Sequence, residues 1–269
     1  MEQCDPAKEL NEFLVPHLAE VIFQADKSLA LLRTIGENAD EINQARFGSL
    51  FGSLQDRLKD HFILSLAKLT DPPRKPYRVR SMPALARFLR DHADELAFQD
   101  EDHVRAYLRG EKPDRPADGE DVAQWYTRRF QEQGATQPPE SPHRTDTALT
   151  KALADSLDAT LDAIRSGAND LAKAYKSVRW LRDKKIAHRE ATGDAMRPEC
   201  TWGDADSLLG RLKELVAVVA MGYCSMSFTD ANGVYHLTRD AGRVGILLER
   251  LLAKARIIRD DSNEDSPQS

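Results

Sequence analysis

Cysteine is scarce in this chain of 269 residues. The three cysteines, Cys4, Cys200 and Cys224, are an odd number, lie far apart and form no Cys-x-x-Cys pair. The sequence therefore encodes neither a disulfide framework nor a thiolate zinc site. A reducing, cytoplasmic compartment is the one that this cysteine usage fits.

Long apolar runs are also missing. The longest uncharged stretch, from Leu215 to Thr229, is shorter than the ~18 residues that a membrane-spanning helix needs. Charged residues interrupt the N-terminal segment, so no signal peptide is expected. The stretch from Leu215 is predicted to be a buried helix, and no contact with a membrane is expected.

Several motifs of common enzymes are absent. The chain has no GxSxG, P-loop or GxGxxG pattern, which argues against a serine hydrolase, a P-loop NTPase and a Rossmann enzyme. It also has no HxxxH or HExxH spacing, and its Asp-His neighbours would point apart on a helix, so neither a metal site nor a cofactor is expected. His61, beside the apolar Leu58 and Phe62, is expected to be a hydrogen-bonded core histidine.

Amphipathic helical periodicity, in contrast, runs through most of the chain. Apolar residues at intervals of three and four predict a helix over about 7–35, bent at its start by Pro16. A second stripe, from Phe47 to Leu69, predicts a helix that follows residues 38–43 and ends at 70–73. In this helix Gly48 and Gly52 either let another backbone approach closely or have no such role.

The rest of the chain continues the helical pattern. A third helix is predicted through Leu85 to Leu96, and after Thr147 a regular seam runs from Leu157 to Val178. Two further helices carry the stripes 208–222 and 244–258, joined by a turn and a strand-like connection at 234–237. The seam is formed by Leu157, Leu161, Ile164, Ala168, Leu171, Tyr175 and Val178, and the last stripe by Val244, Leu248, Leu251, Ala255 and Ile258.

These patterns predict an all-α helical bundle of long antiparallel helices. Its core elements fall in two sequence blocks, about 7–70 and 146–259, which form a single domain over residues 1–259. A Pro-rich helical insertion is expected at about 110–146, and residues 260–269 are expected to form an acidic disordered tail.

Positive charge is concentrated in one segment although the formal net charge of the chain is -6. Residues 171–189 contain seven basic residues and one acid, Asp183. This segment is either a solvated helix face or a surface that attracts a phosphate-bearing partner such as RNA. Its basic residues are Lys173, Lys176, Arg179, Arg182, Lys184, Lys185 and Arg189.

The apolar seam becomes basic without leaving its helix face. Continuing from Val178 by four, three and four residues gives Arg182, Lys185 and Arg189. Because an unpaired charge is costly to bury, these side chains need a cleft or a partner. Either they line a functional cleft, or the bundle ends here and they turn outward or pair with acids of another helix.

His188 follows Arg182 by six residues, which places the two about 120° apart around an ideal helix. They can act together only if the helix ends near Ala187, if the arginine reaches around it, or if a second copy of the chain supplies its own pair. Residues 191–194 are a plausible helix stop, with Gly193 at the C-cap.

The segment around Arg182, Asp183 and His188 resembles the signature of the HEPN superfamily (higher eukaryotes and prokaryotes nucleotide-binding). In that signature an arginine and a polar residue precede a histidine by a short spacer. The segment 186–189 and an earlier helix ending at Leu66-Ala67-Lys68-Leu69-Thr70-Asp71-Pro72 resemble the abortive-infection U branch. The resemblance covers the two helical blocks and leaves the Pro-rich middle unexplained.

This resemblance implies a helical bundle that dimerises so that two motifs share one cleft. It further implies a metal-independent endoribonuclease used in phage defence or toxin–antitoxin systems, with an antitoxin or regulatory protein as a further partner. His188 would transfer a proton and Arg182 would hold phosphate oxygens. Asp183 would orient either the His188 imidazole or the Arg182 guanidinium. The RNA-binding residues would be Lys176, Arg179, Lys184, Lys185 and Arg189.

Two other classes of protein remain open. A catalytically silent RNA- or nucleotide-binding bundle would keep the basic seam without cleaving RNA. In a structural or partner-binding helical protein, Arg182 and His188 would be separated and engaged in internal pairs.

Overall fold

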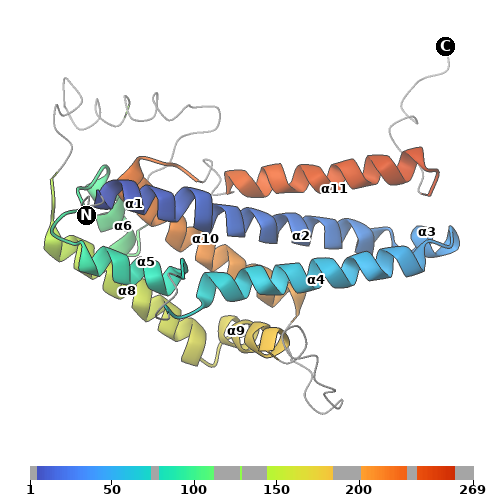
Figure 1. Ribbon diagram of the computed structural model, residues 1–269, viewed down its shortest axis with the longest axis horizontal. Coiled ribbons are helices and arrows are strands. Elements are labelled where there is room, and N and C mark those ends of the chain that lie inside the picture. Colours follow the sequence, from blue (N-terminus) through green and yellow to red (C-terminus); the bar gives the residue numbers. More distant parts are fainter. Residues whose placement is uncertain are drawn as a thin grey trace.

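The computed structural model shows an all-α bundle, as the sequence predicts (Figure 1). It describes residues 5–73, 79–111, 128, 144–183, 201–228 and 235–257. Within these ranges the β features are isolated bridge residues, among them the pair Phe98 and Arg144. None of the helices in the described part of the chain has both the length and the hydrophobicity of a membrane span.

The predicted N-terminal helix is confirmed as one continuous helical rod. It consists of α1 (Pro6–Phe13), the π-helical segment η1 (Leu14–Ala19) and α2 (Glu20–Glu37). Pro16 lies in the π-helical segment, where the altered turn accommodates a residue that has no N–H to donate.

The predicted second helix is α4 (Gly48–Thr70), and the segment before it forms a separate short helix, α3 (Ala39–Gln44). Arg46, with φ at 64°, separates them. Close approach of another backbone at the two glycines is not observed: a Cβ at Gly48 would meet the side chain of Asn43, and one at Gly52 would meet no atom within 4 Å. At the start of the predicted apolar stripe Phe47 and Leu54 are exposed, whereas Phe51 and Leu58 pack against a small cluster formed by Ile35, Ile42 and Leu252.

Three long helices form a layer in which α2 lies between α4 and α11 (His236–Lys254) (Figure 1). Helix α10 (Trp202–Cys224) crosses this layer, and α5 (Met82–Asp91) pairs with α8 (Thr147–Ser166). The predicted core stripe of α10 is confirmed, since all of its members are buried. These members are Leu208, Leu212, Leu215, Val219 and Gly222.

The long seam from Leu157 to Val178 belongs to two helices, not to one. Gly167 follows the last residue of α8, and Asn169 caps α9 (Asp170–Trp180) by accepting a hydrogen bond from the Ala172 N–H. Ala168, predicted to lie on the seam, is exposed in the break. The apolar spacing spans the break, so periodicity alone did not indicate it.

Other predicted boundaries also need correction. Helix α5 ends at Asp91, before the expected Leu96, and α6 (Glu101–Leu108) was not predicted. Of the predicted strand-like connection at 234–237, Tyr235 is an extended bridge residue that caps α11, whereas His236 and Leu237 belong to that helix and residue 234 lies outside the described residues.

The buried face of α11 is shifted by one residue from the predicted stripe. Leu252 is buried, whereas Leu251 is 62% exposed. The reason lies at Gly245, where an added Cβ would come within 2.8 Å of the Thr34 side-chain oxygen of α2. A glycine at this point lets α11 approach α2 closely, and the contact orients the face that contains Ala241 and Leu252 toward the core.

A buried ionic cluster joins α2, α10 and α11. The Lys213 ammonium lies 2.5 Å from an Asp26 carboxylate oxygen and donates to the Thr238 hydroxyl, which in turn donates to the other Asp26 oxygen. The Asp26 side chain is only 3% exposed. Each charged group of the cluster therefore depends on the other for solvation.

We expect Lys213→Met to lower the free energy of unfolding by about 3–5 kcal/mol, because it leaves the Asp26 carboxylate buried without a counter-ion. The double variant Asp26→Leu/Lys213→Met should recover most of this loss, since an apolar pair removes both charges. Urea denaturation measures both effects. The control Arg87→Ala, which breaks an exposed ion pair with Asp91, should cost less than about 1 kcal/mol. Equal losses in the single and double variants would contradict this interpretation.

Candidate active site

The basic segment begins on α9 and continues beyond it. After Trp180 the helix passes into a π-helical turn at residues 181–183, the last described residues before 201. Ala174 and Val178 bury the apolar side of α9 against the core. Arg179 lies in the last turn of α9 and Arg182 in the π-helical turn, a type of turn that is frequent at functional sites.

Asp71 meets these arginines from the end of α4. The Thr70 hydroxyl donates to the carbonyl of Leu66 in the last turn of α4, and Pro72 prevents the helix from continuing. Asp71 itself is extended, with ψ at 136°. Its backbone carbonyl accepts a 2.6 Å hydrogen bond from the hydroxyl of buried Ser81. The position of Asp71 is therefore fixed on both sides.

Two guanidinium groups converge on one oxygen of the Asp71 carboxylate. Arg179 donates to it at 2.9 Å, and Arg182 donates to the same atom in a short hydrogen bond. The Nε–H of Arg182 donates to Asp183 at 2.7 Å. The arginine of the HEPN-like motif is thus held between a carboxylate of its own helix turn and one from another helix.

These contacts determine the charge state of Arg182. Its side chain is 17% exposed, and burial acts to lower the pKa of the guanidinium. Hydrogen bonds to Asp183 and Asp71 outweigh burial and raise this pKa above its ordinary value. Arg182 therefore remains a permanent cation and cannot serve as a proton donor or acceptor near neutral pH.

The structure brings together some of the predicted site residues. Arg182 and Asp183 are in contact, and Arg179, predicted to bind RNA, joins them through Asp71. Lys176 lies apart from this cluster, with its ammonium 3.4 Å from the carbonyl of Gly167 at the end of α8. The remaining predicted site residues, Lys184, Lys185, His188 and Arg189, lie outside the described residues.

Asp71 is the one site residue that the sequence analysis missed. The segment Leu66 to Pro72 was noted for its resemblance and as a helix end, without a role for its carboxylate. The available signal was the charged seam itself, which required an acidic partner for Arg182. That partner is 111 residues away in the chain, and local periodicity contains no information about such a distance.

The sequence analysis expected no metal site, and it expected His61 to be a hydrogen-bonded core histidine. The described residues contain no group of three or more His, Cys, Asp or Glu side chains arranged to hold a metal ion. The Nδ1 atom of His61 lies 2.9 Å from the Ser28 hydroxyl oxygen, so the expected hydrogen bond is present. His61 is nevertheless exposed, so the expectation of a core histidine is wrong.

Comparison with known protein families gives one match, to AbiU2 of the HEPN type, over residues 8–244. The chain belongs to this family. It is therefore a HEPN-type abortive-infection protein, and the match includes both Asp71 and the segment that begins at Arg182. No curated protein and no solved structure matches the chain significantly.

We expect Asp71 and Arg182 to be energetically coupled. In a double-mutant cycle with Asp71→Asn and Arg182→Gln, the coupling in unfolding free energy should be about 0.5–3 kcal/mol. Lys176→Gln is the matched control, because the Lys176 ammonium contacts Gly167, and its coupling to Asp71→Asn should stay within about 0.5 kcal/mol. Urea denaturation of the variants measures both values, and equal coupling in the two cycles would refute the specific pairing.

Proposed function

We propose that the protein is a metal-independent endoribonuclease of the HEPN type that acts as a toxin or phage-defence effector. The observation that carries this proposal is the anchoring of Arg182 by Asp71 and Asp183 at the end of α9. A guanidinium fixed in this way is pre-organised for a phosphate before any substrate arrives. Membership of the abortive-infection family supports the same function.

The proposed reaction uses the nucleophile that RNA itself carries. The 2′-oxygen attacks the adjacent phosphorus and loses its proton, and the bond from phosphorus to the 5′-oxygen breaks as that oxygen gains a proton. The products are a 2′,3′-cyclic phosphate and a 5′-hydroxyl. His188 takes or gives one of these protons, which a group that titrates near neutral pH can do.

Arg182 stabilises the charge that develops on the non-bridging oxygens. A guanidinium has five N–H donors, and the contacts of Arg182 with described residues use two of them. Three donors therefore remain for a phosphate while the side chain stays anchored. Because hydrogen bonds to a developing anion strengthen in the transition state, this contact contributes to the rate more than to binding.

Arg182 alone does not separate this proposal from the silent or structural alternatives. An internal ion pair is what the structural alternative also predicts for this arginine. The ribonuclease proposal differs from both alternatives in predicting that RNA is cleaved, so cleavage is the deciding measurement.

The decisive experiment incubates purified protein with total RNA in excess EDTA. We expect cleavage to persist and to leave 2′,3′-cyclic phosphate ends or their opened product. His188→Ala should lower turnover by ~10²–10⁴-fold with little effect on RNA affinity, because proton transfer belongs to the transition state. A strict requirement for a divalent metal would refute the mechanism.

Two further variants separate rate from affinity in the same assay. Arg182→Lys keeps the charge and loses the planar fork, so its rate should fall near that of an alanine variant. Lys176→Ala should instead weaken RNA binding and reduce the log–log salt slope by ~0.7, the value for one lost contact to a single strand. Unchanged cleavage by both His188→Ala and Arg182→Lys would refute the assignment of the reaction to this motif, whereas RNA binding without cleavage by the wild type would favour the silent-binding alternative.

A homodimer forms part of the proposal, because a second copy can bring a second motif to the cleft. Helix α4 exposes Phe47, Leu50 and Leu54 at spacings of three and four, with Leu50 64% exposed. The same helix ends at Asp71 and contacts α9, whereas α11 packs on the other side of α2 (Figure 1). A copy packed along α4 would therefore lie on the side of the motif.

We expect Leu50→Glu/Leu54→Glu to convert a dimer into a monomer and to reduce cleavage. The matched control Leu247→Glu/Leu251→Glu places the same charges on the exposed face of α11 and should leave the dimer intact. Analytical ultracentrifugation at micromolar concentration distinguishes the two states. A fully active wild-type monomer would contradict a shared cleft, and dissociation by the α11 variant alone would move the interface to α11.

A further inference from the structure

A pocket of about 370 Å³ opens among α2, α4 and the first turn of α10. Its volume lies within the range of small-molecule sites, roughly 300–1,000 Å³. It is lined by Leu29, Leu32, Arg33, Gly36, Gln55, Lys59, Trp202 and Gly203. None of these residues belongs to the Asp71–Arg182 cluster, so the pocket is separate from the candidate active site.

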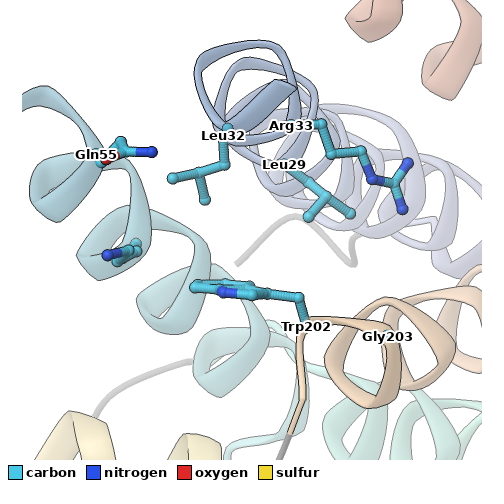
Figure 2. Close-up of a pocket in the computed structure, with 8 residues that line it drawn as sticks. Leu29, Leu32, Arg33, Gln55, Trp202 and Gly203 are labelled. Atoms are coloured by element: carbon cyan, nitrogen blue, oxygen red, sulfur yellow. The ribbon is translucent and has the colours of Figure 1, made fainter. Parts of the chain in front are cut away.

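The walls of the pocket suit a flat ring. Figure 2 shows the Trp202 indole on one side, with the side chains of Leu29 and Leu32 extending toward it from α2. Trp202 is 45% exposed, which is unusual for so large an apolar side chain, while its ring packs against buried Phe62 at 5.8 Å between centroids. The indole is therefore held in place with part of its surface uncovered.

The rim of the pocket is polar but nearly balanced in charge. Gln55 and Arg33 lie at opposite ends of the opening in Figure 2. Arg33 pairs with Asp206 at 2.7 Å, and Lys59 lies 3.6 Å from Asp56. Each cation already has a carboxylate, so the pocket does not favour a compact multivalent anion. It favours a neutral, planar group with polar edges.

We propose that this pocket binds one unpaired nucleobase, stacked on the exposed part of Trp202 and covered by Leu29 and Leu32. The Gln55 amide can donate to and accept from the edge of a base. The assignment to a base of single-stranded RNA depends on the proposed ribonuclease function. The pocket would then be a second place, besides the candidate active site, at which the same RNA contacts the protein.

Helix α4 sets the distance between this contact and the candidate active site. Lys59 lines the pocket and Asp71 follows the end of the same helix, twelve residues later, which corresponds to about 18 Å at 1.5 Å per residue. A stacked strand that advances 3.4 Å per nucleotide covers this distance in ~5 nucleotides. RNA longer than this can occupy both places, and a dinucleotide cannot.

The test measures binding without cleavage. The probe is a fluorescently labelled single-stranded RNA of ~10 nucleotides, about twice that span, with every 2′-hydroxyl methylated so that it cannot attack the phosphate. Fluorescence anisotropy of this probe gives its Kd for the full-length protein. Adenosine monophosphate is tested in parallel by quenching of tryptophan emission, which distinguishes a free nucleotide from an RNA base.

We expect Trp202→Leu to weaken binding of the RNA probe by about 5- to 100-fold, the usual effect of removing one stacking partner. Trp202→Phe keeps an aromatic face and should remain within about threefold of the wild type. A labelled dinucleotide with the same methylation should bind more weakly than the longer probe and gain nothing from contacts near Asp71.

A second pair of variants leaves Trp202 in place, because its contact with Phe62 makes folding sensitive to substitution. Gly36→Leu fills the pocket from a position where an added Cβ meets no atom within 4 Å, and it should weaken binding as Trp202→Leu does. Gly242→Leu on α11 makes the same change, also into open space, away from the pocket. It should leave the Kd unchanged.

Equal affinity of the wild type, Trp202→Leu and Gly36→Leu for the RNA probe would overturn the proposal, as would failure of both RNA and adenosine monophosphate to bind. Trp202-dependent binding of the mononucleotide without binding of RNA would support a base pocket that serves a free nucleotide. The ribonuclease proposal is judged separately, by cleavage of unmodified RNA in EDTA. If unmodified RNA is cleaved and the pocket variants bind the methylated probe with the Kd of the wild type, the pocket proposal alone is refuted.

Discussion

The carboxylate of Asp71 is the contact on which the arrangement of the candidate site depends. Arg179 and Arg182 carry like charges and extend from neighbouring turns of one helix end, where they would repel each other in the absence of an acid. One oxygen of Asp71 accepts from both, and this joins the end of α9 to the end of α4. Because the Arg182 side chain is mostly buried, the interaction is less screened by solvent than a surface ion pair.

The position of Asp71 follows in turn from ordinary backbone chemistry. Pro72 disfavours a helical conformation at the residue before it, so Asp71 leaves α4 in an extended conformation and its side chain no longer follows the helix surface. Ser81, which precedes α5 and is completely buried, then holds the carbonyl of Asp71. A helix terminator and one buried hydroxyl thereby place the carboxylate of the candidate site, and the bundle core supplies the rigidity behind them.

The sequence was sufficient for the fold class and for much of the core, but not for features that depend on distant contacts. The stripe on α10 was identified correctly because all of its members face one continuous core. The seam from Leu157 to Val178 concealed the break at Gly167, since apolar spacing is the same on both sides. On α11 the choice between Leu251 and Leu252 depended on Gly245 meeting α2, which no local pattern shows. The demand for a partner at Arg182 was visible in the sequence, whereas the identity of Asp71 required the tertiary structure.

In the proposed ribonuclease, the residues that attract RNA differ from the residue that stabilises charge during the reaction. The acids Asp71 and Asp183 balance the two arginines that they contact, so this cluster contributes little net field to draw RNA toward the protein. In the proposed function, attraction of RNA would come from basic residues outside the cluster, such as Lys176 and those after Asp183 in the sequence. The cluster instead holds one guanidinium in a fixed direction, which is the property that matters when charge develops on a phosphate. In the proposed reaction, a lysine would contribute mainly to affinity and Arg182 mainly to rate, although both carry the same charge.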